Sequence, residues 1–224
     1  MGKFDEKGIV FYFHNELRAI FFFRDRTPDF RVVFPIQKHT RNILVYPFEH
    51  EPNDGYDGLI TKYEKNVNLG VKTADCLPVI FASENIKGVI HAGWRGLVKG
   101  IFDELAEKLK IFGEKGENIS FVIGPHICEK CYEVKEDVSS IFQDFCRKNK
   151  IDEDRVIRTH NGKIFIDLFS CASEIIKKKI CSSKIYHIDI CVKEDKRFFS
   201  RRRGDMISQP SCLYYSADRD LDKI

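Results

Sequence analysis

Residues 73 to 109 read TADCLPVIFASENIKGVIHAGWRGLVKGIFDELAEKL. Two apolar runs in this stretch, Pro78–Ala82 and Gly88–His91, predict neighbouring strands, because each has strand length and a short polar segment separates them. After Gly96 the period changes, and apolar residues recur every four positions from Leu97 to Leu109. This spacing predicts an amphipathic helix. The stretch therefore indicates two paired strands followed by a helix, which is typical of an α/β fold.

Further apolar runs predict strands and helices on both sides of this unit. Two runs, Ile9–Phe13 and Arg18–Phe23, predict an opening hairpin. Helical spacing predicts helices over Val134–Phe145 and Leu168–Ile176. Because strands outnumber helices and not every strand is followed by a helix, we expect mixed sheets in a single domain that spans residues 1–224. The remaining strand candidates are Arg31–Phe34, Ile43–Tyr46, Gly58–Thr61, Asn68–Thr73, Ile119–Ile123, Ile185–Cys191 and Leu213–Tyr215.

The composition is typical of a water-soluble protein with an ordinary core. Hydrophobic residues make up 43% of the chain and charged residues 32%. The formal charge of +3 is too small to make nucleic acid or an acidic membrane the main partner. No apolar run approaches the roughly 18 residues of a membrane span, and the first apolar runs lack a secretory pattern. We therefore expect a cytoplasmic protein whose cysteines are reduced.

Cys76 and His91 are the residues best placed for chemistry. Cys76 follows one predicted strand and His91 ends another, so their side chains can meet at one sheet edge. One interpretation is a cysteine nucleophile with a histidine base. The other is a zinc site that keeps one coordination position open. A buried thiol beside an ordinary strand-end histidine is the purely structural alternative.

A third ligand would favour the metal site. His39 and His126 both lie at predicted strand ends, and spacing alone does not choose between them. The segment after His91 adds an anion-binding feature, because Arg95 carries a planar guanidinium that suits phosphate. The free N–H groups of the following helix would support the same role.

Two other features favour ordinary roles when taken alone. Cys128 and Cys131 form a C-x-x-C pattern, but no second pair stands at zinc-ribbon spacing, so we expect no metal or redox role. The run Arg201–Arg203 predicts a solvated basic patch. Within it, Arg202 is our candidate for an inward-facing residue that binds an anion.

Seven short motifs occur in an order that we associate with one family, over roughly residues 35 to 203. The chain resembles the laccase-domain or YfiH-like family, whose members are also known as polyphenol oxidases, peptidoglycan editing factors or purine nucleoside phosphorylases. The resemblance implies a single-domain α-β-β-α sandwich with mixed sheets, similar to the catalytic domain of cytotoxic necrotizing factors. The motifs are Gln37-x-His39, Asp57-Gly58-Leu59-Ile60-Thr61, Thr73-Ala74-Asp75-Cys76-x-Pro78-Val79, His91-Ala92-Gly93-Trp94-Arg95-Gly96, Gly124-Pro125-x-Ile127, Cys131-Tyr132-Glu133-Val134 and Phe198-Phe199-Ser200.

The resemblance also implies roles for individual residues. It implies that His39, Cys76 and His91 bind the metal. His126 stands where the family usually has a small residue, so it becomes a candidate for lining the pocket. Two departures from the family pattern are Thr40, in place of a common glycine, and the absence of a Gly-Arg pair after Arg203. The expected catalytic residues are Cys76, His91 and Arg95, and the expected substrate and phosphate contacts are Arg95, Trp94, His126 and Arg202.

For function, the resemblance implies a zinc-dependent purine nucleoside phosphorylase. Its substrates would be phosphate and adenosine, inosine, guanosine or methylthioadenosine, with adenosine deamination as a second activity. A copper-dependent polyphenol oxidase is an alternative, although seven histidines are few for a multicopper electron path. A Cys–His hydrolase that edits peptidoglycan precursors and a metal-stabilised binding module also stay open. The sequence leaves the metal, the preferred nucleoside and the oligomeric state undecided.

Overall fold

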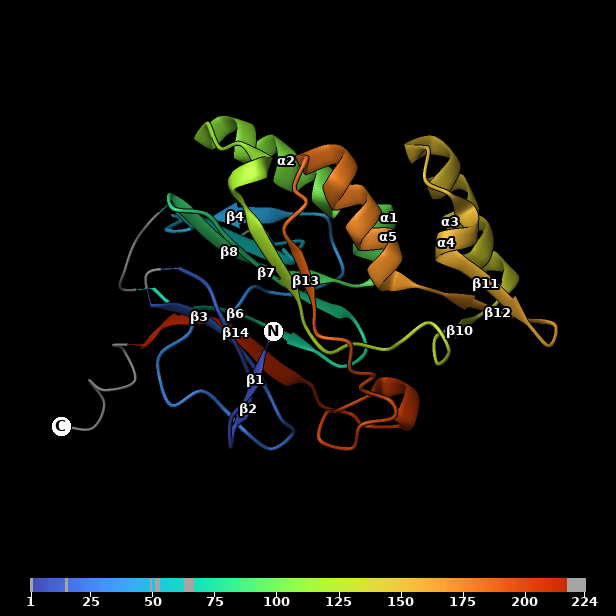
Figure 1. Cartoon of the computed structure of the whole chain (residues 1–224), viewed down its shortest axis with the longest axis horizontal. Coiled ribbons are helices and arrows are strands. Elements are labelled where there is room, and N and C mark those ends of the chain that lie inside the picture. The colour runs from blue at the N-terminus through green and yellow to red at the C-terminus, as the bar shows by residue number, and fades with distance from the viewer. Residues whose placement is uncertain (1, 15, 49, 51–52, 63–66, 217–224) are drawn as a thin grey trace.

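Two large β-sheets stack face to face, and helices cover one outer side of the stack (Figure 1). The computed structural model describes residues 2–14, 16–48, 50, 53–62 and 67–216. Within this part, the predicted mixed α/β fold is confirmed.

The six-stranded sheet carries the unit predicted from residues 73 to 109. Its two outer pairs, β13 with β9 and β4 with β5, are parallel, and the other neighbours are antiparallel, so the sheet is mixed as expected. The late strand predicted over Ile185–Cys191 is wrong beyond His187, where the chain turns away. In spatial order the strands are β13 (Ile185–His187), β9 (Ser120–Ile123), β7 (Leu77–Ala82), β8 (Ile86–Ala92), β5 (Gly58–Lys62) and β4 (Ile43–Val45).

The five-stranded sheet is antiparallel throughout. The predicted opening hairpin is confirmed as β2 and β3, and Asn15 in its turn lies outside the described residues. The predicted C-terminal strand is longer than expected and lies between β3 and β6. In spatial order the strands are β1 (Lys3–Phe4), β2 (Gly8–Tyr12), β3 (Leu17–Phe22), β14 (Gln209–Tyr215) and β6 (Leu69–Thr73).

The outer face of the five-stranded sheet is covered by an irregular segment. Phe30, Val32 and Phe34 pack against Val10, Ile20, Phe22, Cys212 and Tyr214 there. The predicted strand Arg31–Phe34 is therefore wrong. Among the described residues, one bridge, between Val33 and Leu69, joins this segment to the sheet, and its alternate side chains cover the apolar face of the sheet.

The helices lie on the free face of the six-stranded sheet (Figure 1). The single helix predicted after Gly96 is wrong in extent, because Gly100 adopts a left-handed φ of 87° and divides it in two. The described helices lack the length and apolar character that crossing a membrane requires. The helices are α1 (Trp94–Val98), α2 (Ile101–Phe112), α3 (Glu136–Asn149), α4 (Glu153–Val156) and α5 (Leu168–Ile175), which continues as a π-helix (Ile176–Ile180), and two 3-10 turns occur at Gly116–Asn118 and Arg201–Arg203.

A small third sheet was not predicted from the sequence. It joins β10 (Glu133–Val134), β12 (Lys163–Ile166) and β11 (Ile157–His160) in antiparallel order. Its strands are short and partly exposed, so they carry little of the apolar alternation that marks a strand. The helix predicted over Val134–Phe145 begins two residues later than expected, at Glu136, because Val134 belongs to β10.

Two apolar layers hold the sheets and helices together. Between the two sheets, Phe21, Val71 and Leu213 of one sheet pack against Leu59 and Ile80 of the other. Between the six-stranded sheet and the helices, the packed residues include Phe81, Phe102, Phe121 and Phe142. Strands β7 and β8 are buried on both faces, and this fixes the loop ends on which the candidate site is built.

Candidate metal centre and active site

Three side chains predicted as metal ligands converge at one end of the β7–β8 pair. Pro78 faces His91 across the antiparallel ladder, so Cys76, just before β7, lies beside His91. His39 reaches them from the irregular chain before β4. The three ligand atoms lie within 4.8 Å of one another, and His39 Nε2 is 3.9 Å from Cys76 Sγ. The structure therefore brings together the three residues whose meeting the sequence analysis expected.

The buried Asp57 contacts both candidate histidine ligands. Its carboxylate is fully buried, and Oδ1 lies 2.6 Å from His91 Nδ1. It also accepts the backbone N–H groups of His39 and Thr40, at 3.1 Å and 2.6 Å. Thr40, where the family often has glycine, adds its hydroxyl at 2.9 Å. These contacts hold His39 in a left-handed conformation with φ 56°, which non-glycine residues seldom adopt without such support.

The electrostatics of the centre favour a thiolate. Burial raises the pKa of Cys76, but hydrogen bonds from His39 and His91 and their charge outweigh this and bring it to about 6. Burial lowers the pKa of His91, while the bonds to Asp57 and Cys76 raise it to about 9. Without a metal, an imidazolium and a thiolate therefore face each other at neutral pH. A thiolate is the form of cysteine that binds metals.

A cavity of about 500 Å³ opens over these residues. Its volume lies within the range that holds a small organic ligand. Three cations and one phenol stand on its wall, in addition to the candidate ligands. The lining residues are Pro35, Gln37, His39, Lys72, Ala74, Asp75, Cys76, His91, Tyr132, Arg201, Arg202 and Ser208.

Asp75 ties the C-terminal wall of the cavity to the Cys76 loop. Its carboxylate accepts the Ser200 hydroxyl at 2.6 Å and the Arg202 backbone N–H at 2.9 Å. The Arg202 guanidinium lies 5.0 Å from the centre of the Tyr132 ring and donates to the Glu133 carbonyl at 2.7 Å. Arg202 is thus placed at the cavity as predicted, with its side chain held against an aromatic ring.

Tyr132 was not predicted as a site residue from the sequence. Burial, with the nearby Cys76, raises the pKa of Tyr132 to about 12, against the opposing charges of Arg202 and Arg95. Its hydroxyl therefore stays protonated at neutral pH. Gln37, Lys72, Asp57 and Asp75 were likewise missed as site residues, because one buried or strand-end polar residue carries no signal until its partners are known.

Three predicted site residues lie elsewhere among the described residues. The Arg95 guanidinium is exposed and stacks 4.4 Å from the centre of the Trp94 ring, and Trp94 packs against the helical core. Neither lines the cavity. His126, expected to line the pocket, is instead buried in a stack with His187, and its Nδ1 is bonded to the Gly124 carbonyl at 2.8 Å.

The model of a family described as multi-copper polyphenol oxidoreductase laccase matches residues 16–208. The chain belongs to this laccase family. A purine nucleoside phosphorylase of Aquifex aeolicus is 38% identical over 146 residues, which are 65% of this chain and 64% of that protein, so the match spans less than two thirds of that relative.

Two further relatives have names that refer to purine nucleosides. A purine nucleoside phosphorylase of Bacteroides thetaiotaomicron is 34% identical over 77% of this chain and 68% of its own length. An adenosine deaminase, RL5, from an unknown prokaryotic organism is 32% identical over 77% of this chain and 70% of its own length. Among solved structures, protein YfiH of Bacillus licheniformis superposes with a TM-score of 0.76 at 22% identity, over 95% of this chain and 97% of its own, and thus shares its fold.

Proposed function

We propose that this chain is a zinc-dependent purine nucleoside phosphorylase with adenosine deamination as a second activity, working as a single catalytic domain. The observation that carries the proposal is the meeting of His39, Cys76 and His91 at a cavity lined by cations. Relatives named purine nucleoside phosphorylase and adenosine deaminase support it. The substrates would be adenosine, inosine, guanosine or methylthioadenosine, together with phosphate.

The donor set suits zinc. Catalytic zinc sites have three protein ligands drawn from histidine, cysteine and carboxylate and leave a fourth position for water or substrate, and two imidazoles with one thiolate fit this pattern. The Asp57 carboxylate accepts a hydrogen bond from His91 Nδ1–H, so Nε2 is the nitrogen left for the metal. Bound zinc supplies a Lewis acid that polarises oxygen ligands and lowers the pKa of water.

The cations of the cavity wall would hold the phosphate. Arg202 offers a planar fork of donors, and Lys72 is the nearby point charge. Arg95 lies off the wall and acts only through its charge. In phosphorolysis, a phosphate oxygen forms a bond to the ribose C1′ while the bond from C1′ to the purine nitrogen breaks. The base leaves with that electron pair and takes up a proton, and ribose 1-phosphate is formed.

Holding both reactants in one cavity is the main work of the protein residues here, because positioning removes much of the entropic barrier of a two-substrate reaction. Tyr132, which stays protonated, is placed to donate a hydrogen bond to a substrate oxygen. The buried Asp75 keeps Arg202 on the cavity wall through its backbone.

Two other activities each have one observation in their favour. The family description names a multicopper polyphenol oxidase, and the same ligands can hold copper. The paired Cys76 and His91 also have the protonation states of a cysteine hydrolase. A hydrolase would keep activity after His39→Ala, whereas metal-dependent phosphorolysis would not.

The deciding experiment measures metal content together with phosphate-dependent release of base from adenosine and inosine. We expect zinc in the purified protein, base release that depends on phosphate, and loss of turnover in both Cys76→Ser and His39→Ala. Cys181→Ser serves as the control, because Cys181 is exposed and follows the distant π-helix. Base release independent of metal and phosphate, or oxygen consumption with phenols instead, would overturn the proposal.

A further inference from the structure

A second group of cysteines shares no residue with the candidate metal centre. The sulfur atoms of Cys128, Cys131 and Cys191 lie within 4.8 Å of one another. Cys191 is 9% exposed, and the other two are partly buried. Sulfurs held tetrahedrally by zinc at about 2.3 Å lie about 3.8 Å apart. The three thiols are therefore close to the separation that a single bound ion imposes.

Two similar turns present these side chains. In the first, the Cys128 carbonyl accepts the N–H groups of Cys131 and Tyr132, both at 3.0 Å. In the second, the Cys191 carbonyl accepts the N–H groups of Glu194 and Asp195, at 3.1 Å and 2.9 Å. Each turn thus brings its first and fourth side chains to the same side, as the paired turns of structural zinc sites do.

Glu194 completes the second turn. Its Oε1 lies 3.5 Å from Cys131 Sγ, so a carboxylate stands at the position where a fourth cysteine would be expected. The C-x-x-C pair has a second half, Cys191-x-x-Glu194, which a search for cysteines alone does not find. Carboxylate oxygen is an accepted zinc ligand beside thiolates.

The backbone fixes the two turns against each other. The Cys128 N–H donates to Cys191 Sγ at 3.4 Å. Next to it, His126 and Cys191 form a parallel bridge, with Val192 N–H bonded to the His126 carbonyl at 3.0 Å. Because these hydrogen bonds already hold the three cysteines close together, binding of an ion would cost little conformational entropy.

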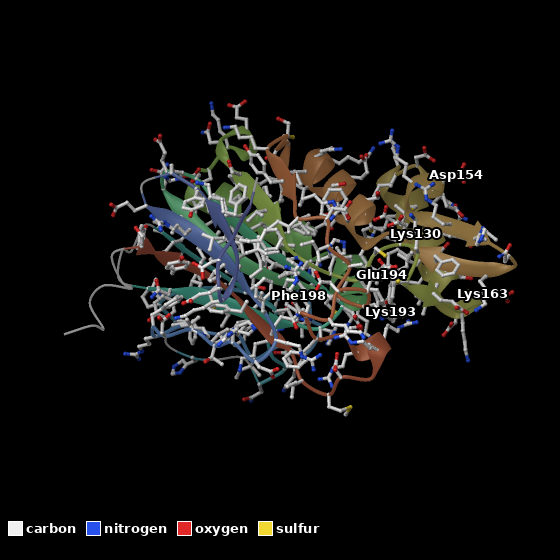
Figure 2. All side chains as sticks on the ribbon, turned by 60° about the horizontal axis from the view of Figure 1, so that its bottom comes forward. Lys130, Asp154, Lys163, Lys193, Glu194 and Phe198 are labelled. Carbon is white, nitrogen blue, oxygen red and sulfur yellow. The ribbon has the colours of Figure 1, made fainter. Side chains whose placement is uncertain are left out.

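The surroundings supply compensating charge. Three thiolates and a carboxylate exceed the charge of a divalent ion, so nearby cations are needed. Figure 2 places Lys130 and Lys193 close to Glu194 on one side of the molecule, and both lysines lie within the two turns. Glu129 stands beside Lys130 in the first turn, so the exposed lysines would offset only part of the excess negative charge, and at long range.

We propose that Cys128, Cys131, Cys191 and Glu194 form a second metal site, which takes a thiophilic divalent cation of the zinc class and has a structural role. With four protein ligands it keeps no open position for substrate. It joins the loop that leads into Tyr132 to the segment that leads into Arg202, and both of these line the cavity. The proposal does not depend on the reaction catalysed at that cavity.

The test counts metal at each site separately. The reduced protein is loaded with Zn²⁺, passed through gel filtration and analysed for metal. We expect about two zinc ions per chain in the unchanged protein, about one in Cys76→Ser, about one in Cys131→Ser and none in the double variant. Cys181→Ser, the matched control, keeps about two. Glu194→Gln, a milder change, weakens zinc binding at this site by about tenfold.

A spectroscopic readout separates ligand loss from misfolding. Co²⁺ bound to Cys76→Ser gives strong near-ultraviolet absorption from thiolate-to-metal charge transfer, and the Cys76→Ser/Cys131→Ser variant loses it while its circular dichroism is unchanged. Zinc content equal in Cys131→Ser and the unchanged protein would overturn the proposal. A Cys128–Cys131 disulfide with no zinc uptake after its reduction would overturn it as well.

Discussion

Asp57 Oδ1 lies 2.6 Å from His91 Nδ1, and the same oxygen accepts the backbone N–H of His39 at 3.1 Å. One buried carboxylate therefore sets the ring of one candidate ligand and the backbone of another. Burial raises the pKa of Asp57, but its hydrogen bonds from His91 and Thr40 lower it more, so it stays ionised. Asp57 acts as a positioning residue for the whole centre.

Replacing this carboxylate should weaken metal binding without removing a ligand. In Asp57→Asn a neutral amide replaces the carboxylate that accepts the hydrogen bond from His91 Nδ1–H. The His91 ring is then held less strongly in the form that leaves Nε2 free for the metal. We expect the zinc Kd to rise about 10- to 100-fold. Competition with a chelator measures the Kd, and a thermal melt shows how much of the effect is loss of folding.

Asp54→Asn is the matched control for that change. Asp54 lies three residues away and is exposed, and among the described residues its side chain contacts Asn42 at 3.4 Å. Asp54→Asn removes one negative charge, as Asp57→Asn does, and we expect it to leave the zinc Kd unchanged. Equal zinc affinity in Asp57→Asn and Asp54→Asn would contradict the positioning role.

Gly93 tests how tightly the centre is packed. A Cβ atom there would lie 2.7 Å from His39 Cδ2 and 3.0 Å from Cys76 Sγ. Its φ of −73° suits alanine, so Gly93→Ala changes space and not backbone conformation. We expect zinc binding to weaken about tenfold, with a cost of about 1 to 3 kcal/mol in unfolding free energy.

Gly96→Ala provides the comparison for Gly93→Ala. Its Cβ would meet one atom at 3.0 Å, the Thr40 carbonyl oxygen, and the next neighbours lie at 3.9 Å. Isothermal titration of zinc into both variants measures the difference. A weaker effect at Gly93 than at Gly96 would show that the glycine does not keep room for the ligands.

The sequence predicted most of the large sheets, because their strands are buried and carry continuous apolar runs. Strands β7 and β8 are buried over their whole length and were placed to within two residues. The small sheet of β10, β11 and β12 has exposed polar positions, so it gave no periodic signal. The break at Gly100 was missed because the apolar spacing continues across it.

Two different arguments predicted the three candidate ligands from the sequence. Cys76 and His91 were predicted to meet because both lie at the ends of predicted neighbouring strands. The choice of His39 over His126 came from the family resemblance. The structure shows the physical difference between these histidines, since His39 is held by Asp57 and His126 is bonded to Gly124 away from the cavity. Long-range partners of this kind, like Glu194 for Cys131, cannot be read from local spacing.

The two arginines predicted to bind phosphate should differ in effect. Arg202 lines the cavity, whereas Arg95 is exposed on Trp94. Arg202→Gln removes a charge-assisted contact, so we expect the KM for phosphate to rise about tenfold with a smaller change in kcat. Arg95→Gln should change the KM less than about twofold, because solvent screens its charge. Initial rates at varied phosphate decide this, and a larger effect at Arg95 would contradict the assignment.

His126 should make the folded state sensitive to acid. Burial lowers the pKa of His126 to about 4, and the charge of His187 lowers it further, while the Gly124 bond, Asp167 and Asp189 oppose this. The unfolded chain therefore takes up a proton near pH 6.5 that the folded chain takes up only near pH 4. Stability is fully present above pH 6.5 and falls as the pH drops through this window, by about 3 kcal/mol.

Urea unfolding at pH 7, 5.5 and 4.5, with a chelator present, measures this loss. His126→Asn keeps an N–H donor for the Gly124 carbonyl and removes the titrating group, so its stability should fall less between pH 6.5 and 4 than that of the unchanged protein. His160→Asn changes an exposed histidine of β11 and should keep the full dependence. The same acid dependence in all three proteins would mean that carboxylates elsewhere, and not the buried stack with His187, set the acid limit of the fold.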